Sequence, residues 1–271
     1  MPISVAWIDG CWGSPDSLQL PLSDRGLQLA DGLFETVLIL DGVPQLLTEH
    51  LARWVASASL LGMDIPPTRQ KLTPLIKDAI NKSGLIKGSG ALRLNWSRGS
   101  EQQRTISLPV SNVHRFWLTL TPCQTNFKPV TVITSQLERR NSDSLVSRCK
   151  TFAYGAAIQA RREAEAAGGD DALLQNNRLE LCCGTVANLL VRRDGVWITP
   201  PLNSGCLPGV MRGRALASGL VQEASLGVSL KQDDESLLIN SLSCRPIRKH
   251  NGQQTRVFQG VIDLWKHLLT F

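Results

Sequence analysis

The sequence predicts an α+β (mixed α/β) protein of two lobes with a cleft between them, and three observations support this prediction. Strand-like and helix-like segments alternate along most of the 271 residues. A stretch with two prolines and little periodicity, residues 121–129, separates the halves. The composition, 42% hydrophobic and 19% charged, is that of an ordinary globular chain. We expect a smaller N-terminal α/β domain over residues 1–122, a linker over 123–129 and a larger C-terminal domain over 130–271.

Apolar runs bounded by turn residues predict the strands of the first half. Residues 5–8 and 32–40 are each followed by an Asp-Gly pair, which is typical of a tight hairpin turn. Apolar residues recur at helical spacing after Thr48, and Ser83-Gly84 ends a second helix. The expected elements are strands over residues 5–8, 32–40, 91–96 and 116–120, and helices over residues 48–62 and 69–82.

The second half continues with strands and helices. An alanine-rich run over residues 156–167 predicts a helix that ends at Gly168-Gly169. The turn Asp194-Gly195 joins two short strands. The expected elements are strands over residues 130–134, 172–174, 189–192, 196–199 and 237–240, and helices over residues 156–167, after Gly209 and over about 260–269.

Charge and composition narrow the classes of function. The formal charge of +6 suits a small anionic substrate. It also raises nucleic-acid binding as an alternative, but the densest basic group, residues 245–250, is short and lacks interleaved aromatics. Neither a membrane span nor a secretory leader is visible, so we expect a cytoplasmic protein without membrane or nucleic-acid partners. Seven cysteines without disulfide or metal-ligand spacing predict reduced thiols and no metal site.

Lys150 lies directly before the alanine-rich helix. Taken alone it is most simply a solvated lysine, although an amine in an apolar cleft can lose its proton and react with an aldehyde. A glycine before a helix, as at Gly209, lets backbone amides approach an anion. Lys150 and Gly209 belong to an ordered series of motifs. The series is Asp24-Arg25-Gly26, Asp31-Gly32-Leu33-Phe34-Glu35-Thr36, His50-Leu51-Ala52-Arg53, Lys150-Thr151-Phe152-Ala153-Tyr154, Leu207-Pro208-Gly209-Val210-Met211-Arg212 and Ile239-Asn240-Ser241-Leu242.

In order and spacing, these motifs resemble the fold-type-IV pyridoxal phosphate enzymes, the class IV aminotransferase family, and most closely their small bacterial lyases. The resemblance implies a C-terminal pseudo-barrel, an active site in the interdomain cleft and pyridoxal 5'-phosphate as cofactor. It implies that Lys150 is the catalytic residue that carries the cofactor, and that Phe34 lies on the substrate side. The implied cofactor contacts are Lys150, Arg53, Tyr154, Cys183, Leu207, Gly209, Val210, Met211 and Ser241.

One departure from the family pattern concerns the pyridine nitrogen of the cofactor. Five residues before Asn188 the family has a glutamate that keeps this nitrogen protonated, and this chain has Cys183. Glu180 could substitute only through a shift of register. A thiol forms weak hydrogen bonds, which favours elimination of a good leaving group over transamination.

A second departure concerns the substrate carboxylate. Leu38 stands where the family commonly has a basic residue. Arg93, Arg98 and Arg104 could replace that anchor, because the related segment of the family lines the substrate side. We select Arg98 and Arg104 as the substrate-binding candidates.

The resemblance implies a lyase that eliminates pyruvate from 4-amino-4-deoxychorismate and gives 4-aminobenzoate for folate synthesis. It also implies a homodimer whose active sites take loops from both subunits. Two alternatives stay open. One is an aminotransferase of branched-chain or D-amino acids. The other is a cofactor-binding relic with weakened or lost catalysis, which Cys183 favours, as does Ala153, where the family pattern has Asn three residues after the lysine.

Overall fold

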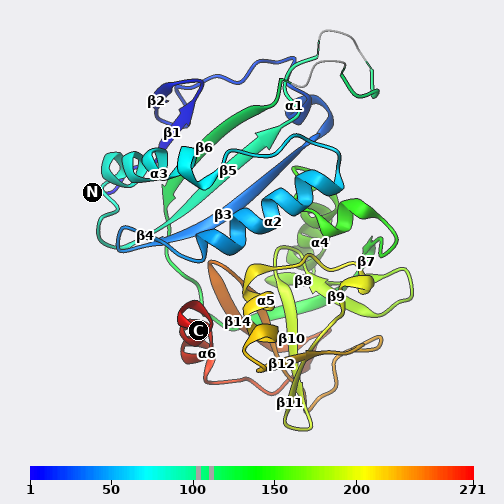
Figure 1. Cartoon of the computed structure of the whole chain (residues 1–271). Coiled ribbons are helices and arrows are strands. Elements are labelled where there is room, and N and C mark those ends of the chain that lie inside the picture. The colour runs from blue at the N-terminus through cyan, green and yellow to red at the C-terminus, as the bar shows by residue number, and fades with distance from the viewer. Residues whose placement is uncertain (102–104, 110–112) are drawn as a thin grey trace. The chain divides into compact units, whose positions relative to one another are not determined.

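A computed structural model describes residues 1–101, 105–109 and 113–271, and it has the mixed α/β fold class that the sequence predicts (Figure 1). The chain forms two compact units. Unit 1 contains residues 1–124 and 149–153, and unit 2 contains residues 125–148 and 154–271. The first division falls inside the expected linker. The short segment 149–153 packs with unit 1, whereas the sequence places it in the C-terminal domain.

Unit 1 is built on an antiparallel sheet with the strand order β2-β1-β6-β5-β3-β4. One face carries fully buried leucines, such as Leu92 and Leu94 of β5, and packs against helices α2 and α3 (Figure 1). Successive residues of a strand point to opposite faces. The elements are β1 (Val5–Ile8), β2 (Cys11–Gly13), α1 (Arg25–Leu29), β3 (Gly32–Leu40), β4 (Val43–Pro44), α2 (Leu47–Leu60), α3 (Arg69–Ser83), β5 (Ser89–Ser97) and β6 (Arg115–Pro122).

Local sequence explains the ends of the helices in unit 1. Asp24 begins α1 because its carboxylate accepts a hydrogen bond from Gly26 N. Gly84 ends α3 in the left-handed conformation (φ +74°), and its amide donates to Asn81 O. The sequence correctly predicts that this helix ends at Gly84.

Unit 2 contains a sheet that closes on itself. Its strands pair in the cyclic order β10-β13-β14-β7-β8-β9, and β9 returns to β10. Helix α4 packs on β7 and β8, α5 on β13, and α6 on β14. The elements are β7 (Val130–Arg140), 3-10 turns at Leu145–Arg148 and Leu202–Ser204, α4 (Gly155–Ala166), β8 (Asp171–Asn176), β9 (Leu181–Gly184), β10 (Asn188–Arg193), β11 (Val196–Thr199), α5 (Val210–Ala217), β12 (Val221–Glu223), β13 (Glu235–Asn240), β14 (Ser243–His250), β15 (Gln253–Gln254) and α6 (Val261–Thr270).

The basic group that the sequence analysis weighed as a nucleic-acid contact lies in strand β14. This strand pairs with β13 and β7 inside the closed sheet, and Ile247 and His250 are buried. The alternation of the strand separates these charges between its two faces. Within the part of the chain that is described, the helices are too short or too polar to cross a membrane.

Candidate active site

The backbone around Lys150 is fixed to strand β3. Phe34 N donates to Lys150 O (2.9 Å), and Phe152 N donates to Gly32 O (3.1 Å). Thr151 forms an isolated antiparallel bridge with Leu33 between these two bonds. The half-buried Lys150 side chain places Nζ 4.2 Å from the centre of the Phe34 ring. The structure therefore brings the two predicted residues Lys150 and Phe34 together.

The absence of a side chain at Gly32 makes room for the ring of Phe152. A Cβ atom at Gly32 would lie 2.1 Å from Phe152 Cε2. We expect Gly32→Ala to displace Phe152, destabilise the protein by about 1–3 kcal/mol through overpacking and weaken cofactor binding through the moved Lys150. Thermal unfolding and a cofactor titration measure both effects. Gly155→Ala is the control, because a Cβ there meets no atom within 4 Å; equal loss in both variants would contradict the prediction.

Arg53, the predicted phosphate clamp, is held by Glu35. Its Nε donates to Glu35 Oε1 (2.8 Å) and its Nη2 to Glu35 Oε2 (2.5 Å). His50 Nδ1 lies 2.7 Å from Glu35 Oε2. His50 and Arg53 are three residues apart on α2 and so share a helix face. Glu35 therefore fixes the orientation of Arg53, a role that the sequence analysis missed.

Glu35 is ionised inside the protein. Burial alone raises the pKa of its carboxyl, but the charge of Arg53 and the hydrogen bonds from His50 and Arg53 outweigh burial and lower the pKa to about 2. Only 1% of the Glu35 side chain is exposed. The Arg53 guanidinium is thus paired and rigid, which suits a phosphate clamp, and its contact with the cofactor stays a prediction.

Arg98, a predicted substrate anchor, is buried within unit 1. Its Nε donates to Asp31 Oδ2 (2.9 Å), and its two Nη atoms donate to Gly62 O (2.9 Å) and Leu61 O (3.0 Å). Asp31 also accepts a hydrogen bond from Arg25 Nε (2.9 Å). The bonds of Arg98 use three of the five N–H donors of its guanidinium and hold it within unit 1, and a role of Arg98 in substrate binding stays a prediction. The other anchor candidate, Arg104, lies outside the described residues.

In unit 2, the start of helix α5 has the form of an anion site. Gly209 N donates to Leu207 O (2.8 Å), so the amide of Gly209 is already used within the chain. Among the described residues, no side chain caps this helix. The first amides of a helix lack intrahelical partners, and the dipole there favours an anion. Val210 and Met211 are therefore the predicted phosphate donors with the stronger structural support.

Asn188 holds the loop before α5. Its Nδ2 donates to Leu207 O (2.9 Å), and a Cβ atom at Gly209 would lie 1.8 Å from its Oδ1. The loop can take this path only because residue 209 has no side chain. Asn188 is a second residue whose positioning role the sequence analysis missed.

We expect Gly209→Ala to weaken the binding of pyridoxal phosphate about tenfold or more, the effect of losing one charge-assisted hydrogen bond. The new methyl group must push the loop away from Asn188 and so move the amides of Val210 and Met211. An absorbance titration with the cofactor measures the effect. Gly213→Ala, in the same helix, is the matched control because its Cβ meets no atom within 4 Å. Unchanged affinity in Gly209→Ala would rule out this anion site.

The other predicted cofactor residues of unit 2 lie at the ends of elements. Leu207 is half-buried in the loop before α5. Tyr154 precedes α4, and Ile158 N donates to Tyr154 O (2.9 Å). Ser241 is half-buried in the turn between β13 and β14, which Asn240 Oδ1 fixes by accepting from Leu242 N (2.8 Å). Their contacts with a cofactor stay predictions.

Cys183 lies on β9 directly opposite Asn188 of β10. Its side chain is buried in a cluster with Cys182 and Cys206. A hydrogen bond from the Cys182 thiol lowers the pKa of Cys183; burial opposes this effect, and the positive charge of Arg140 adds to it. The position opposite Asn188 is therefore a thiol that is more acidic than an isolated buried cysteine.

Glu180 does not take the place of Cys183. Its carboxylate accepts hydrogen bonds from Asn176 Nδ2 (3.0 Å), Arg178 Nε (3.1 Å) and Ser225 Oγ (2.8 Å). Glu180 and its partners Asn176 and Arg178 lie at the turn between β8 and β9. The ungapped register, with Cys183 opposite Asn188, is the one that the structure has.

Comparison with known proteins agrees with the motifs. A family model described as amino-transferase class IV matches residues 32–250. A Schizosaccharomyces pombe protein, provisionally named an aminodeoxychorismate lyase, is 29% identical over 216 residues, 77% of this chain and 85% of that protein. A Methanocaldococcus jannaschii protein, provisionally named a branched-chain-amino-acid aminotransferase, is 26% identical over 216 residues, 76% of this chain and 71% of that protein.

The solved structures confirm the fold type. A Legionella pneumophila structure, provisionally named a 4-amino-4-deoxychorismate lyase, is 26% identical with a TM-score of 0.85, and the match covers 94% of this chain and 96% of that one. The match of the family model extends over well more than half of the 271 residues. The chain therefore belongs to the class IV aminotransferase family.

Proposed function

We propose that this protein is a pyridoxal phosphate-dependent lyase that eliminates pyruvate from 4-amino-4-deoxychorismate and releases 4-aminobenzoate, a precursor for folate synthesis. One observation carries the choice of a lyase. The position opposite Asn188 is the thiol of Cys183, while the nearby carboxylate of Glu180 is bound at the β8–β9 turn. Transamination depends more strongly on a carboxylate at the pyridine nitrogen than elimination does. The similarity to two provisionally named lyases supports the same choice.

The residues present fit the cofactor. The glycine cradle at Gly209 and the uncapped amides of Val210 and Met211 suit a phosphate group. Arg53, oriented by Glu35, is the predicted second phosphate ligand. Lys150 is the amine that would hold the cofactor through its aldehyde.

When bound, the cofactor supplies an electron sink for the substrate carbon that carries the amine. Lys150 Nζ is the general base that takes the proton from this carbon. The carbon–oxygen bond at the neighbouring carbon then breaks, its electron pair leaves with the pyruvate group as the enolate, and the Lys150 ammonium gives its proton to that departing group. Bonds from Lys150 and Phe152 to β3 keep Nζ beside Phe34 during these transfers.

The runner-up is an aminotransferase of branched-chain or D-amino acids, which the Methanocaldococcus jannaschii relative supports. The third hypothesis is a cofactor-binding relic without catalysis. An aminotransferase needs a keto acid to accept the amine, whereas a lyase does not. We also propose a homodimer, and sedimentation of the purified protein tests it: a particle of one 29.7 kDa chain would contradict it.

The test uses cofactor-loaded protein with 4-amino-4-deoxychorismate, and pyruvate and 4-aminobenzoate are both quantified. We expect equal amounts of the two products and slower glutamate formation from leucine or D-alanine with 2-oxoglutarate. Glutamate without 4-aminobenzoate would identify an aminotransferase. No product from any substrate would identify a relic, and activity gained by Cys183→Glu would then locate the loss at this thiol.

A further inference from the structure

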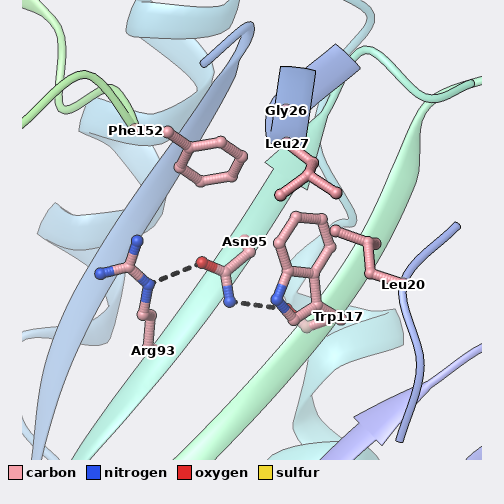
Figure 2. A pocket seen from close by; sticks show the side chains of 7 residues that line it. All are labelled: Leu20, Gly26, Leu27, Arg93, Asn95, Trp117 and Phe152. Carbon is pink, nitrogen blue, oxygen red and sulfur yellow. Dashed lines mark hydrogen bonds between the residues drawn. The ribbon is translucent and has the colours of Figure 1, made fainter. Parts of the chain in front are cut away.

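Unit 1 contains a pocket of about 240 Å³ on the sheet face opposite helices α2 and α3 (Figure 2). Pockets for drug-sized ligands run to roughly 300–1,000 Å³, so this one suits a smaller molecule of about one ring. Strands β5 and β6 supply its floor, since Asn95 and Trp117 are directly opposite each other. The lining residues are Leu20, Gly26, Leu27, Arg93, Asn95, Trp117 and Phe152.

Arg93 is the one charged residue among the described residues that line the pocket. Its Nε donates to Asn95 Oδ1 (2.7 Å), and Asn95 Nδ2 donates to Trp117 O (3.3 Å). The second bond fixes the amide so that its oxygen faces Arg93. The guanidinium carbon lies 3.5 Å from the centre of the Phe34 ring, a close cation–π contact. The positive charge in the pocket is therefore held in one orientation (Figure 2).

Aromatic rings form the walls beside this charge. The ring centres of Trp117 and Phe152 are 5.6 Å apart, and those of Phe152 and Phe34 are 6.2 Å apart with an angle of 29° between the ring planes. Leu20 and Leu27 add apolar surface next to Trp117 (Figure 2). Aromatic faces favour a planar ring in offset or edge contact. An apolar wall with one fixed guanidinium is complementary to a flat ring that carries a carboxylate.

The pocket adjoins Lys150 within the same unit. Lys150 Nζ and the Arg93 guanidinium both lie against the Phe34 ring, at 4.2 Å and 3.5 Å from its centre. Phe152, a wall of the pocket, follows Lys150 by two residues and is bonded to β3 with it. A molecule in the pocket therefore lies about one ring away from the predicted reacting amine.

We propose that this pocket is the ring-carboxylate subsite of the enzyme: it takes a planar, unsaturated six-membered ring, Arg93 pairs with the carboxylate, and Trp117 and Phe152 contact the ring. The assignment of Lys150 as the reacting group rests on the proposed function. Recognition of the ring carboxylate does not, because it follows from the pocket alone. Arg93 and Trp117 are then the residues that select a cyclic substrate over an aliphatic amino acid.

Calorimetric titration of the full-length, cofactor-loaded protein with three simple probes tests this proposal. Benzoate has both the ring and the charge, benzamide lacks the charge, and cyclohexanecarboxylate lacks the planar ring. We expect benzoate to bind, benzamide to bind at least about tenfold more weakly through the loss of one charged contact, and cyclohexanecarboxylate to bind about two- to tenfold more weakly through the loss of the aromatic contact. Failure of the wild type to bind benzoate, or equal binding of all three probes, would overturn the proposal.

Variants identify the residues. Arg93→Gln should weaken benzoate binding about 10- to 100-fold, the range for a lost hydrogen bond to a charged group. Arg93→Lys, which keeps the charge without the planar fork, should fall between Gln and the wild type. Arg162→Gln is the control, since Arg162 is exposed on α4. Circular dichroism verifies folding, and folded Arg93→Gln with wild-type benzoate affinity would overturn the assignment.

The two proposals fail separately. Arg93-dependent benzoate binding without release of 4-aminobenzoate from 4-amino-4-deoxychorismate would leave the subsite in place and refute the lyase. Conversely, 4-aminobenzoate release with the same KM in the wild type and Arg93→Gln would support the lyase and refute the subsite.

Discussion

Replacement of Lys150 by alanine is expected to abolish the visible absorbance of the lysine-bound cofactor and to reduce turnover by roughly 10³-fold or more, because both the covalent attachment and the general base are lost. The segment around Lys150 is held by backbone bonds to Phe34 and Gly32, and the side chain makes none of these bonds. The fold should therefore persist. Absorbance spectra of cofactor-loaded protein and initial rates of 4-aminobenzoate formation measure the two effects.

Lys128→Ala is the control for this experiment, since Lys128 is an exposed lysine of unit 2. It should keep the absorbance band and the rate of the wild type. If Lys150→Ala keeps the band and Lys128→Ala loses it, Lys128 and not Lys150 is the lysine that binds the cofactor. Equal bands in all three proteins would refute a lysine-bound cofactor at Lys150.

The second large effect is expected at Glu35. Glu35→Gln removes the negative charge between Arg53 and His50 and leaves the Arg53 charge without its buried partner. Breaking a buried ion pair costs about 3–5 kcal/mol. We expect a loss of this size in the free energy of unfolding, and weaker cofactor binding because Arg53 is no longer oriented. Urea unfolding at neutral pH measures the first, and a cofactor titration of the folded variant measures the second.

The same carboxylate predicts a dependence of stability on acid. The pKa of Glu35 is about 2 in the folded protein, below its ordinary value of 4.5, so it contributes stability above pH 4.5 that is lost as the pH falls toward 2. The difference corresponds to about 3 kcal/mol. The gap in stability between the wild type and Glu35→Gln should narrow over this range, and Glu165→Gln, at an exposed position of α4, should show no such gap. A gap that is constant with pH would contradict an ionised Glu35.

Local patterns were enough to predict much of the fold. The strands at residues 5–8, 32–40 and 196–199 have the predicted bounds, because turn residues with a defined backbone conformation bracket each apolar run. Helices α2 and α3 were predicted to within about one or two residues, since α3 ends at a glycine in the left-handed conformation, whereas the five-residue helix α1 was not predicted. These signals act within a few residues of the chain.

Strand β14 was missed because its sequence contradicts the usual pattern. It contains Pro246, which lacks an amide donor, and several basic residues. The structure accommodates the proline because the pairing of β14 with β7 begins only at Ile247. The basic side chains do not disturb the pairing, because strand pairing uses only backbone groups. The pairing of β14 with β7 joins segments more than 100 residues apart, and the local sequence does not indicate it.

Site residues could be predicted where they belong to a short sequence motif. They could not be predicted where they depend on contacts between residues far apart in the sequence. Lys150 and Gly209 stand in the expected local structures. Arg98 was predicted to bind the substrate, and its local sequence does not indicate the three bonds to Asp31, Gly62 and Leu61 that hold its buried side chain. Arg93 differs from Arg98 in its strand pairing. The register of the sheet places Asn95, two residues from Arg93, opposite Phe34 of β3 and Trp117 of β6. Such long-range pairing requires the structure.

The most direct test of a lyase counts the 4-aminobenzoate formed per subunit from 4-amino-4-deoxychorismate in the absence of any keto acid. The proposed reaction returns the cofactor to its starting form on Lys150, so many equivalents of 4-aminobenzoate, matched by pyruvate, should accumulate. An amine transfer would stop after one equivalent of substrate, with the amine left on the cofactor, and would resume only on addition of 2-oxoglutarate. That result would contradict the proposed elimination of pyruvate and assign the chain to the aminotransferases by activity.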